Sequence, residues 1–518
     1  AACRARRRCA RPAALAAVVL VGASGGSLLL RGGLLLGAAS APLEVDAVFV
    51  TDCSDYQEWL TQVFLARWRR AGPHGATLTR VIACDAADTR LKRALEFMQS
   101  YSGEVETFVL PELNGQGADR YLCNNRPRGL RRWLKAKPPR SPNHWVASLD
   151  PDMLALRPLL PGQFWRVSGG ADLGGPFVRL QDVPEAIALA HHFHFVHKDW
   201  RRLNLSLPAL CADDPRVPAS CEARLRGLFE DADLVAREYS VGVPHMLRAV
   251  DLERMAETWE IFTDRVRRQY HGWTAEMFSW ILAARLAGVR FSYLAEVVSD
   301  PSAAEPAWTG VDSMMSEQAL QQRPQRDPCR AADLDDTARP LAAGGRTAGR
   351  SGPWLLHYCE IYNVSFAARG TASGGTTYLD KRMVGKAVKA MARQEAGNFS
   401  SLLDCGAPLF EPPPRDLLSR RVHDPRQSAA EQLFRRSSWL LCTTLGALNA
   451  GLRGFRQHRC AADGLGKQTL RAVPKRALVA EYLLTAGDRL RRHEHVDWAA
   501  RLNATRARLG ALPERSWS

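Results

Sequence analysis

Apolar and polar residues alternate with two different periods along the first third of the chain. Four short apolar stretches, rich in β-branched residues, predict strands at residues 44–51, 76–84, 105–111 and 144–150. Three amphipathic stretches between them predict helices at residues 54–72, 88–101 and 126–136. Ser54 or Asp55 supplies the N-cap of the first helix, which ends at Gly72-Pro73. Strands that alternate with helices indicate βαβ units, so we expect the α/β class with a mostly parallel sheet.

The rest of the chain continues this mixture with longer helices. Residues 236–270 pass from a strand to a helix, and residues 274–289 predict a helix that Thr274 caps and Gly288 ends. Residues 300–352 are poor in aromatic residues and rich in Ala, Gly, Pro, Arg and Asp, which predicts a flexible insertion. Regular structure is expected again from residue 353, and residues 425–518 predict a mainly helical C-terminal extension.

The N-terminal segment has the pattern of a membrane-targeting sequence. Five arginines among the first eleven residues precede an apolar run from Pro12 to Leu30. A basic flank followed by about 19 apolar residues predicts a signal anchor, with the bulk of the chain in a lumen. The small residues of GAASAP (37–42) also fit the cleavage site of a signal peptide, and an Arg-rich transit peptide is a third interpretation.

Charge and cysteine content limit the kinds of partner. Lys and Arg total 70 against 54 Asp and Glu, a formal charge of +16, but the basic residues are dispersed and no nucleic-acid module stands out. The excess fits a phosphate-bearing substrate or a membrane surface, and equally a generic Arg-rich composition. None of the 12 cysteines forms a C-x-x-C pair, so zinc ribbons are not expected, whereas disulfides are possible in an oxidising lumen. Four N-glycosylation sequons agree with that compartment: Asn204, Asn363, Asn398 and Asn503.

The stretch HWVASLDPDMLALRPL (144–159) ends an apolar strand on two aspartates around a proline. Residues i and i+2 of a strand lie on one side of it, so Asp150 and Asp152 can converge on one cation, while Pro151 holds Asp150 extended. Paired carboxylates are ligands that suit Mg²⁺ or Mn²⁺. Asp-x-Asp recurs at 231/233 and 333/335, but only the pair at 150/152 follows a buried strand. An ordinary solvated turn is the alternative interpretation.

Several segments resemble the plant and algal family that contains peptidyl serine α-galactosyltransferases and hydroxyproline O-arabinosyltransferases. The resemblance covers most of residues 45–460, in pieces. It rests on VTDCSDYQEWLTQVFLARWRRAG with LTRVIAC, NRPRGLRRWL (125–134), SLDPDMLALRPL, WTAEMFSWILAARLAGV, LLHYCEIY (355–362), and LLDCGAPLFEPPP with LLCTTLGALNAGLRGFRQHRC (440–460). The tail resembles the galactosyltransferases, whereas YLDKR (378–382) is closer to the arabinosyltransferases.

The resemblance implies a GT-A-like fold, a UDP-sugar donor, Mn²⁺ or Mg²⁺, and transfer with retention to hydroxyproline-rich, extensin-like proteins. We expect galactose transfer to serine first, and arabinofuranose transfer to hydroxyproline as the alternative. It further implies a single-pass type II membrane protein of the Golgi or endoplasmic reticulum. Residues 1–43 would then be the cytosolic tail and anchor, 44–299 the nucleotide-sugar and acceptor core, 300–352 the insertion, 353–424 the completion of the catalytic domain and 425–518 the helical extension.

The resemblance also assigns site residues. His357 would complete the metal site of Asp150 and Asp152. Glu276 is the candidate catalytic residue, which orients the sugar or acceptor hydroxyl or stabilises positive charge at the anomeric carbon; a carboxylate favoured by the helix dipole is the alternative. The candidate donor-binding residues, each with a purely structural alternative, are Asn125, Arg126, Lys381 and Arg382, and Trp273 is a possible sugar-stacking residue.

Two further interpretations concern a cluster of histidines and the possibility that the protein binds glycoproteins without catalysis. The cluster HHFHFVH holds His191, His192, His194 and His197. It predicts an aromatic surface or acceptor groove rather than a zinc site, because no Cys or carboxylate has suitable spacing. A non-catalytic lumenal glycoprotein-binding protein would keep the fold without turnover, but the intact Asp150, Asp152 and Glu276 argue against it.

Overall fold

The computed structural model describes residues 42–113, 121–322, 324, 327–330, 352–367, 374–394, 399–419, 428–460 and 469–470. The predicted anchor within residues 1–43 therefore lies almost wholly outside the described residues, as does the C-terminal part of the predicted helical extension. Within the described ranges, no helix combines the length and the apolar character needed to cross a membrane.

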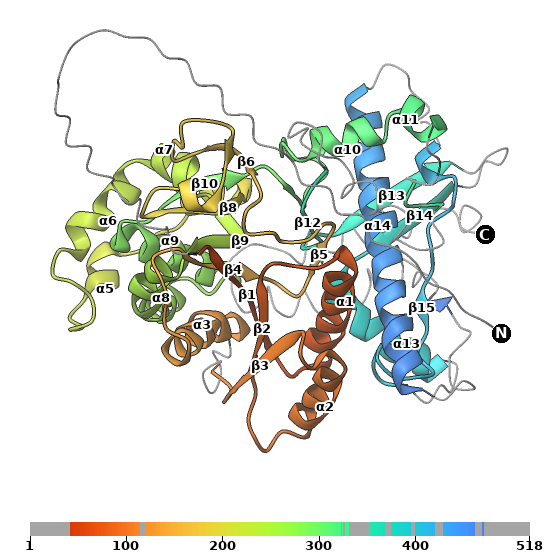
Figure 1. Cartoon of the computed structure of the whole chain (residues 1–518), viewed down its shortest axis with the longest axis horizontal. Coiled ribbons are helices and arrows are strands. Elements are labelled where there is room, and N and C mark those ends of the chain that lie inside the picture. The colour runs from red at the N-terminus through yellow and green to blue at the C-terminus, as the bar shows by residue number, and fades with distance from the viewer. Residues whose placement is uncertain are drawn as a thin grey trace, which may run out of the picture. The chain divides into compact units, whose positions relative to one another are not determined.

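A nine-stranded sheet forms the centre of the described chain, in the order β3-β2-β1-β4-β9-β8-β10-β6-β7 (Figure 1). The pairs β3-β2, β2-β1, β1-β4 and β8-β10 are parallel, and only β9 and β6 run opposite to the rest. The strands span β1 Glu44–Asp52, β2 Thr77–Ala83, β3 Val105–Leu110, β4 His144–Leu149, β6 Trp165–Gly170, β7 Phe177–Val178, β8 Ile187–His192, β9 Val241–Arg248 and β10 Arg290–Leu294.

The described helices include the four predicted at residues 54–72, 88–101, 126–136 and 274–289, each of which begins and ends within three residues of its prediction. The helices are α1 Asp55–Ala71, α2 Thr89–Met98, α3 Asn125–Ala136, α4 His194–Trp200, α5 Leu207–Cys211, α6 Cys221–Glu230, α7 Ala232–Leu234, α8 Ala249–Gln269, α9 Ala275–Ala287, α10 Trp308–Met314, α11 Glu317–Gln322, α13 Val384–Gln394 and α14 Ser428–Arg459. The predicted α/β class, with a mostly parallel sheet and a helical C-terminal part, is confirmed.

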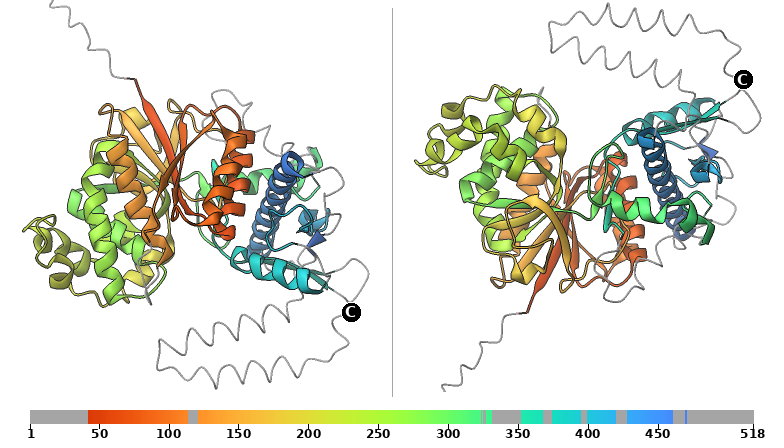
Figure 2. Two further views of the ribbon diagram at one scale, coloured as in Figure 1. Left: turned by 90° about the horizontal axis from the view of Figure 1, so that it is seen from below. Right: turned by 90° about the horizontal axis from the view of Figure 1, so that it is seen from above.

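Both faces of the sheet are covered by helices. Consecutive residues of its central strands point to opposite faces, and the residues on each face are apolar. Val48 and Val146 belong to the core that includes α3, α8 and α9. Ala47 and Trp145, their sequence neighbours, belong to the core that includes α1. Figure 2 shows the helices of residues 125–136 and 249–287 on one side of the strands, and the helix of residues 55–71 on the other. Such two-sided burial explains why the strands read as nearly continuous apolar runs.

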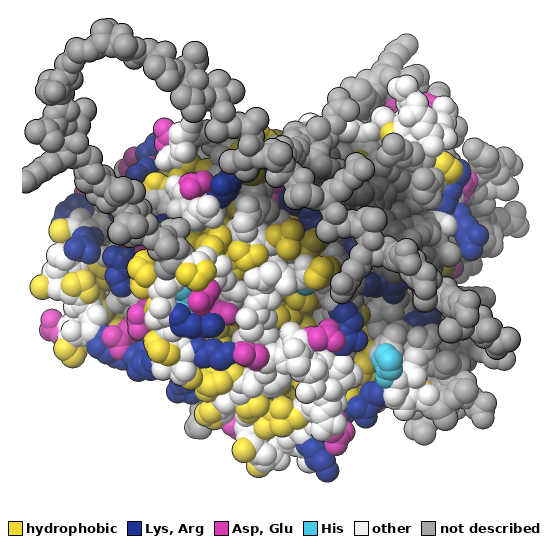
Figure 3. All heavy atoms as spheres, in the orientation of Figure 1, with side chains coloured by type: hydrophobic (Ala, Val, Ile, Leu, Met, Phe, Trp, Pro, Cys, Tyr) yellow, Lys and Arg dark blue, Asp and Glu magenta, His cyan; other side chains and the backbone are white. Residues whose placement is uncertain are grey.

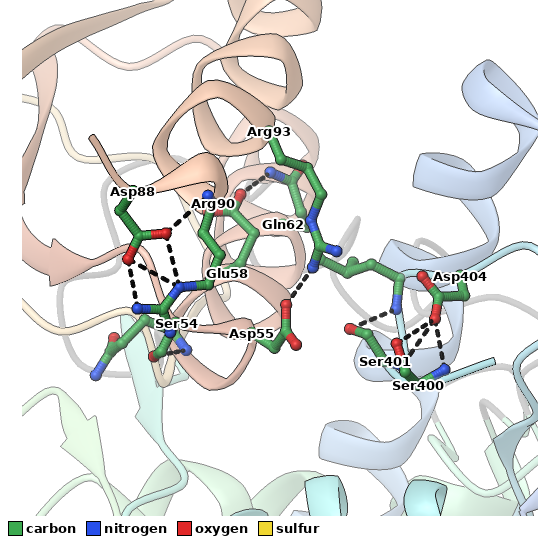
Figure 4. Close-up of polar contacts among 12 residues, drawn as sticks. Ser54, Asp55, Glu58, Gln62, Asp88, Arg90, Arg93, Ser400, Ser401 and Asp404 are labelled. Atoms are coloured by element: carbon green, nitrogen blue, oxygen red, sulfur yellow. Dashed lines mark hydrogen bonds and ion pairs between the residues drawn. The ribbon is translucent and has the colours of Figure 1, made fainter. Parts of the chain in front are cut away.

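Polar contacts fix the ends of α1 and α2 (Figure 4). Ser54 is the N-cap of α1, as predicted, and its side chain accepts a hydrogen bond from the Gln57 backbone N–H at 3.3 Å. Asp88 caps α2 by accepting from the backbone N–H of Arg90 at 2.8 Å. An ion pair from Arg93 to Asp55 joins the two helices. The caps satisfy backbone donors that helix starts leave unpaired.

A small second sheet pairs residues 297–298 and 355–357 with residues 153–155, which directly follow the central strand β4. It has the order β11-β12-β5, formed by Val297–Val298, Leu355–His357 and Met153–Ala155. Two further pairs are β13 Tyr362–Ala367 with β14 Gly374–Leu379, and β15 Leu409–Phe410 with β16 Thr469–Leu470. Helix α14 packs beside α1 with a shared apolar core (Figure 1).

Four disulfides bind the described chain together. They join Cys53 to Cys84, Cys211 to Cys221, Cys329 to Cys442 and Cys405 to Cys460. The third closes 113 residues of sequence and ties the segment after α11 to α14. The pairing agrees with the expectation of an oxidising compartment.

Two local predictions need correction. Thr274 occupies the N-cap of α9, but its side chain makes no capping hydrogen bond, because its hydroxyl contacts the Tyr270 hydroxyl at 2.9 Å instead. The predicted flexible insertion at 300–352 is regular in its first part, where α10 and α11 form and Trp308 is fully buried. Trp308, Val311 and Met315 are buried in the core that includes α14, which the composition of the segment did not indicate. Residues 331–351 lie outside the described residues.

A buried ion pair joins α1 to β2. The Arg80 guanidinium donates to both carboxylate oxygens of Glu58, at 3.2 and 2.7 Å, and to the Thr51 hydroxyl at 3.0 Å. Gln62 donates a further hydrogen bond to Glu58 at 2.8 Å. Both charged side chains are almost fully buried, so each depends on the other for compensation of its lost hydration.

We predict that Glu58→Gln lowers the free energy of unfolding by about 3–5 kcal/mol, because it leaves the buried Arg80 charge uncompensated. The matched control is Glu104→Gln. Its pair with Arg69 has exposed fractions of 52% and 41%, so the expected loss is below about 1 kcal/mol. Chemical denaturation of both variants measures the difference, and equal losses would contradict the assignment of Glu58 as a buried structural charge.

Candidate functional site

The two aspartates and the histidine predicted from the sequence lie together. Asp150, Asp152 and His357 each offer one ligand atom, and these atoms lie within 4.8 Å of one another. His357 Nε2 is 3.4 Å from Asp152 Oδ1. Among the described residues, one other such group exists, Cys53, Cys84 and Asp88, but its cysteines form a disulfide and offer no thiolate.

Strand pairing explains how His357 reaches aspartates that lie more than 200 positions earlier in the chain. Strand β12 runs antiparallel to β5, with His357 opposite Met153. The Tyr358 backbone N–H donates to the Asp152 carbonyl at 3.1 Å, which extends the ladder by one residue. The register places His357 opposite Met153 and Tyr358 opposite Asp152, so the ladder brings His357 next to the turn that carries Asp152.

The sequence placed both aspartates at the end of one strand, but the chain turns there. Strand β4 ends at Leu149, Asp150 to Asp152 form a turn, and β5 begins at Met153. The turn is at the edge of the central sheet where parallel strands end, which is where ligands bind in open α/β sheets. The strand-alternation argument for convergence was thus wrong in its geometry, and a turn brings the two carboxylates together instead.

Two basic side chains lie against the aspartates. Arg126 forms an ion pair with Asp150, and its other nitrogen Nη1 is 3.4 Å from Glu276 Oε2. Lys381 forms an ion pair with Asp152 Oδ2. Burial, together with the nearby positive charge of Arg382, lowers the pKa of the Lys381 ammonium to about 7. The site therefore gathers three carboxylates and two cations, with Arg126 linking Asp150 to Glu276.

Glu276 is buried at the second position of α9, where a negative charge is favoured by the helix dipole. Burial raises the pKa of its carboxyl, and Arg126 opposes that rise. Its Oε1 atom has no hydrogen-bond partner within the described part of the chain, although its surroundings exclude solvent. A buried acceptor without a partner is costly, and Oε1 retains the capacity to accept a hydrogen bond.

Tyr121 positions this carboxylate and was not identified from the sequence. Its hydroxyl accepts from the Glu276 backbone N–H at 2.9 Å and donates to the Trp273 carbonyl at 2.6 Å. His245 was also missed: it is buried near Arg126, stacks on Trp280 at 4.2 Å, and burial lowers its pKa. Nothing in the local sequence pattern marks either residue, because the contacts of Tyr121 with Glu276 and of His245 with Trp280 join separate segments of the chain.

The other predicted donor-binding residues divide into two groups. Arg126 and Lys381 lie in the site, as described above. Asn125 has a structural role, because its buried side chain accepts from the Leu113 backbone N–H at 3.1 Å. Arg382 bonds Asp380 through Nε at 2.9 Å and leaves most of its side chain in solvent. Trp273 is 67% exposed and joins the site through its carbonyl bond to Tyr121.

The histidine cluster splits among separate partners. His191 contacts Glu305 at 3.2 Å, His194 lies 3.7 Å from Asp300, and His197 contacts the Ser240 hydroxyl at 3.2 Å. His192 packs on Tyr293 with ring centroids 4.5 Å apart. None of these histidines belongs to the possible metal groups found among the described residues.

The donor set of Asp150, Asp152 and His357 fits a divalent ion. Carboxylate oxygens with one imidazole suit Mn²⁺, and oxygen-rich sets suit Mg²⁺. His357 Nδ1 is buried without a hydrogen-bond partner in the described chain. No hydrogen bond of that atom to the described residues therefore conflicts with a role of the ring as a metal ligand. Both aspartates already attract cationic groups, which shows the electrostatic preference of this position.

The face of the molecule drawn in Figure 3 does not suggest a polyanion-binding surface. On the described part of the face in Figure 3, Lys and Arg side chains are scattered among acidic side chains rather than gathered into a stripe. This distribution agrees with the dispersed basic residues of the sequence.

Two curated proteins resemble the chain, and both are named peptidyl serine alpha-galactosyltransferase. The protein from Arabidopsis thaliana is 23% identical over 265 residues, which cover 48% of this chain and 27% of the relative. The protein from Chlamydomonas reinhardtii is 27% identical over 152 residues, covering 29% of this chain and 19% of the relative. The chain thus spans about a quarter or less of the length of these relatives.

Solved structures similar to this chain are glycosyltransferases by name. They include the galactosyltransferase LgtC in complex with donor and acceptor sugar analogues, with 10% identity, a TM-score of 0.29, and coverage of 61% of this chain and 87% of that one. Mouse xyloside xylosyltransferase 1 has 10% identity, a TM-score of 0.28, and coverage of 61% and 97%. No protein-family model matches the sequence. The resemblance to peptidyl serine α-galactosyltransferases predicted from the motifs is confirmed by the two curated relatives.

Proposed function

We propose that the protein is a metal-dependent glycosyltransferase that moves galactose from a UDP-sugar to serine hydroxyls of hydroxyproline-rich polypeptides, with retention. The single observation that carries this proposal is the convergence of Asp150, Asp152 and His357 beside the buried Glu276, with Arg126 between them. The names of the two curated relatives support the choice of galactose and serine.

Asp150, Asp152 and His357 are the residues that would hold the ion. When bound, a divalent cation supplies Lewis-acid stabilisation of the negative charge on a departing diphosphate. Lys381 lies against Asp152 and brings a donor group to the same place, so it can bind a phosphate oxygen of the leaving group. Arg126 holds the Asp150 carboxylate and so keeps it in position.

Glu276 acts on the sugar side of the reaction. Its Oε1 can accept a hydrogen bond from a sugar or acceptor hydroxyl, and its negative charge stabilises the positive charge that develops at the anomeric carbon. In a front-face displacement the serine oxygen bonds to the anomeric carbon as the bond to the diphosphate oxygen breaks. The serine proton passes to a phosphate oxygen of the leaving group, so no enzymic base is required.

We further propose a lumenal location in the Golgi or endoplasmic reticulum. Four disulfides among the described residues support an oxidising compartment. The predicted N-terminal anchor stays a prediction, since its residues lie outside the described part.

The transfer prediction is tested with a serine- and hydroxyproline-containing peptide. The peptide is incubated with UDP-galactose or UDP-arabinofuranose, with Mn²⁺ or with a chelator, and the product is weighed by mass spectrometry. We expect a hexose gain with UDP-galactose that disappears on chelation. A pentose gain with UDP-arabinofuranose alone would replace serine galactosylation by hydroxyproline arabinosylation. No metal-dependent UDP release from either donor would favour a non-catalytic binding protein.

The ligand set is tested by Asp152→Asn, which removes one negative ligand with little change of volume. We expect a loss of Mn²⁺ binding by calorimetry and a fall in kcat/KM of roughly 100-fold or more, because Lewis-acid stabilisation contributes several kcal/mol. The circular dichroism spectrum should be unchanged.

The matched control is Asp233→Asn in the second Asp-x-Asp pair. Its side chain is 80% exposed and bonds Arg201, so this change should leave Mn²⁺ binding and transfer intact. Normal Mn²⁺ binding and transfer in the Asp152 variant would refute the proposed ligands.

A further inference from the structure

A cavity of about 540 Å³ lies between α1, α2 and α14. Its described walls are the last turn of α1, the end of α2 with the turn Gln99–Tyr101 that follows it, and α14 from Ala447 to Arg459. None of the residues assigned above to the metal site, the sugar or the donor is part of this lining. Small-molecule sites have volumes of roughly 300–1,000 Å³, so the cavity is large enough for a ligand of its own.

Two glycines of α14, nearly one helical turn apart, explain the space between the helices. A Cβ on Gly451 would lie 3.0 Å from the Cα of Val63, so α14 packs closely against α1 there. A Cβ on Gly454 would meet no atom within 4 Å, although this residue lines the cavity. Glycine within a helix is less favourable than alanine, and no close contact requires it at position 454. Gly454 therefore leaves open a space that a larger side chain would fill.

The charged side chains of the cavity are mainly arginines. Among the described lining residues, four arginines stand against the single carboxylate of Glu96: Arg67, Arg69, Arg70 and Arg459. Arg459 Nη2 is 3.9 Å from Glu96, and both side chains of this pair are about 40% exposed, so their attraction is weak. The excess of positive charge favours an anion in the cavity.

Aromatic rings and the backbone hold these arginines in place. The Arg459 guanidinium lies 4.4 Å from the centroid of the Phe97 ring, and that of Arg69 lies at the same distance over Tyr101. The buried Arg67 donates through Nε to the last carbonyl of β5 at 2.7 Å. A guanidinium on an aromatic face keeps N–H groups at its edge, in a geometry that matches phosphate oxygens. Groups held in this way lose less entropy when a ligand binds.

The remainder of the lining is largely apolar. Phe97 and Phe455 contribute rings that meet edge to face, with centroids 4.7 Å apart. Ala447, Ala450 and the glycines of α14 offer only methyl groups and backbone. A small hydrated anion makes little use of such a surface, whereas the apolar part of an amphiphilic anion is stabilised by contact with it.

We propose that the cavity binds an amphiphilic phosphate monoester, with its phosphate against the arginines and its apolar body against the rings and small residues of α14. Phosphate is favoured over carboxylate because a phosphate monoester carries nearly two negative charges at neutral pH and several arginines surround the space. A lipid or a soluble phosphate ester has this chemistry. The inference is independent of the proposed sugar transfer, because the two sites share no residue.

The ligand class is tested by calorimetry of the full chain with octyl phosphate, below its critical micelle concentration. Inorganic phosphate and octyl glucoside carry only the anion or only the chain. We expect octyl phosphate to bind roughly tenfold more tightly than either, because hydrogen bonds to a charged group add to apolar contact. Equal affinity for octyl phosphate and octyl glucoside, or no binding of octyl phosphate, would overturn the proposal.

Two competitors separate the possible sources of the ligand. Displacement of octyl phosphate by dihexanoyl phosphatidic acid would identify a lipid, and displacement by 1-naphthyl phosphate alone would identify a soluble aromatic ester. Displacement by neither would contradict a phosphate monoester as the ligand.

Variants locate the binding in this cavity. Gly454→Leu fills the open space and favours the helix, so we expect an equal or higher Tm and a loss of octyl phosphate affinity of roughly tenfold or more. Arg459→Gln should weaken binding about tenfold, and Glu96→Gln should strengthen it severalfold. The control is Arg453→Gln, an exposed arginine of α14 outside the lining, which should leave the affinity unchanged. Wild-type affinity in either the Gly454 or the Arg459 variant would refute this location.

Discussion

The site depends on the antiparallel pairing of two three-residue strands, β5 and β12. This short ladder joins Met153 to His357 and continues through the Tyr358 N–H bond to the Asp152 carbonyl. Without it, the aspartates would form an isolated turn at the edge of the central sheet, and the histidine would have no reason to be near them. The rest of the small sheet, the hairpin β13–β14 and helix α14 serve to bring and hold β12 in this place.

Electrostatics gives the site its second constraint. Three carboxylates in a mostly buried region repel one another and lose hydration, which is unfavourable unless cations compensate. Arg126 lies between Asp150 and Glu276, and Lys381 lies against Asp152. This arrangement compensates the carboxylate charges and leaves Glu276 Oε1 without a hydrogen-bond partner in the described chain. The charged side chains that stabilise one another in the folded protein are therefore the same ones that the proposed reaction requires.

Local sequence pattern predicted the parts of the fold that local interactions determine. The strand and helix alternation over residues 44–150, the Ser54 cap and the end of α9 at Gly288 follow from periodicity and capping chemistry. The aspartate pair was also visible, because it follows a buried strand. Its turn geometry was not, since alternation within a strand says nothing about where the strand ends.

Features that depend on distant contacts were beyond sequence reasoning. The placement of Tyr121 against Glu276 joins positions 155 residues apart, and the ring contact of Phe195 with Trp273 joins α4 to the turn before α9. His357 was placed through family resemblance rather than through any physical signal in its own segment. Helix α10 shows the same limit, because burial of Trp308 against Trp439 gives order to a segment whose composition indicates flexibility.

The central claim, that Asp150, Asp152 and His357 form one divalent-ion site, is tested most directly by anomalous diffraction from crystals soaked with Mn²⁺ and UDP. We expect one manganese peak bonded to both carboxylates and to the imidazole, with the UDP diphosphate on its open side. Manganese bound elsewhere, or UDP bound away from these three side chains, would contradict the claim.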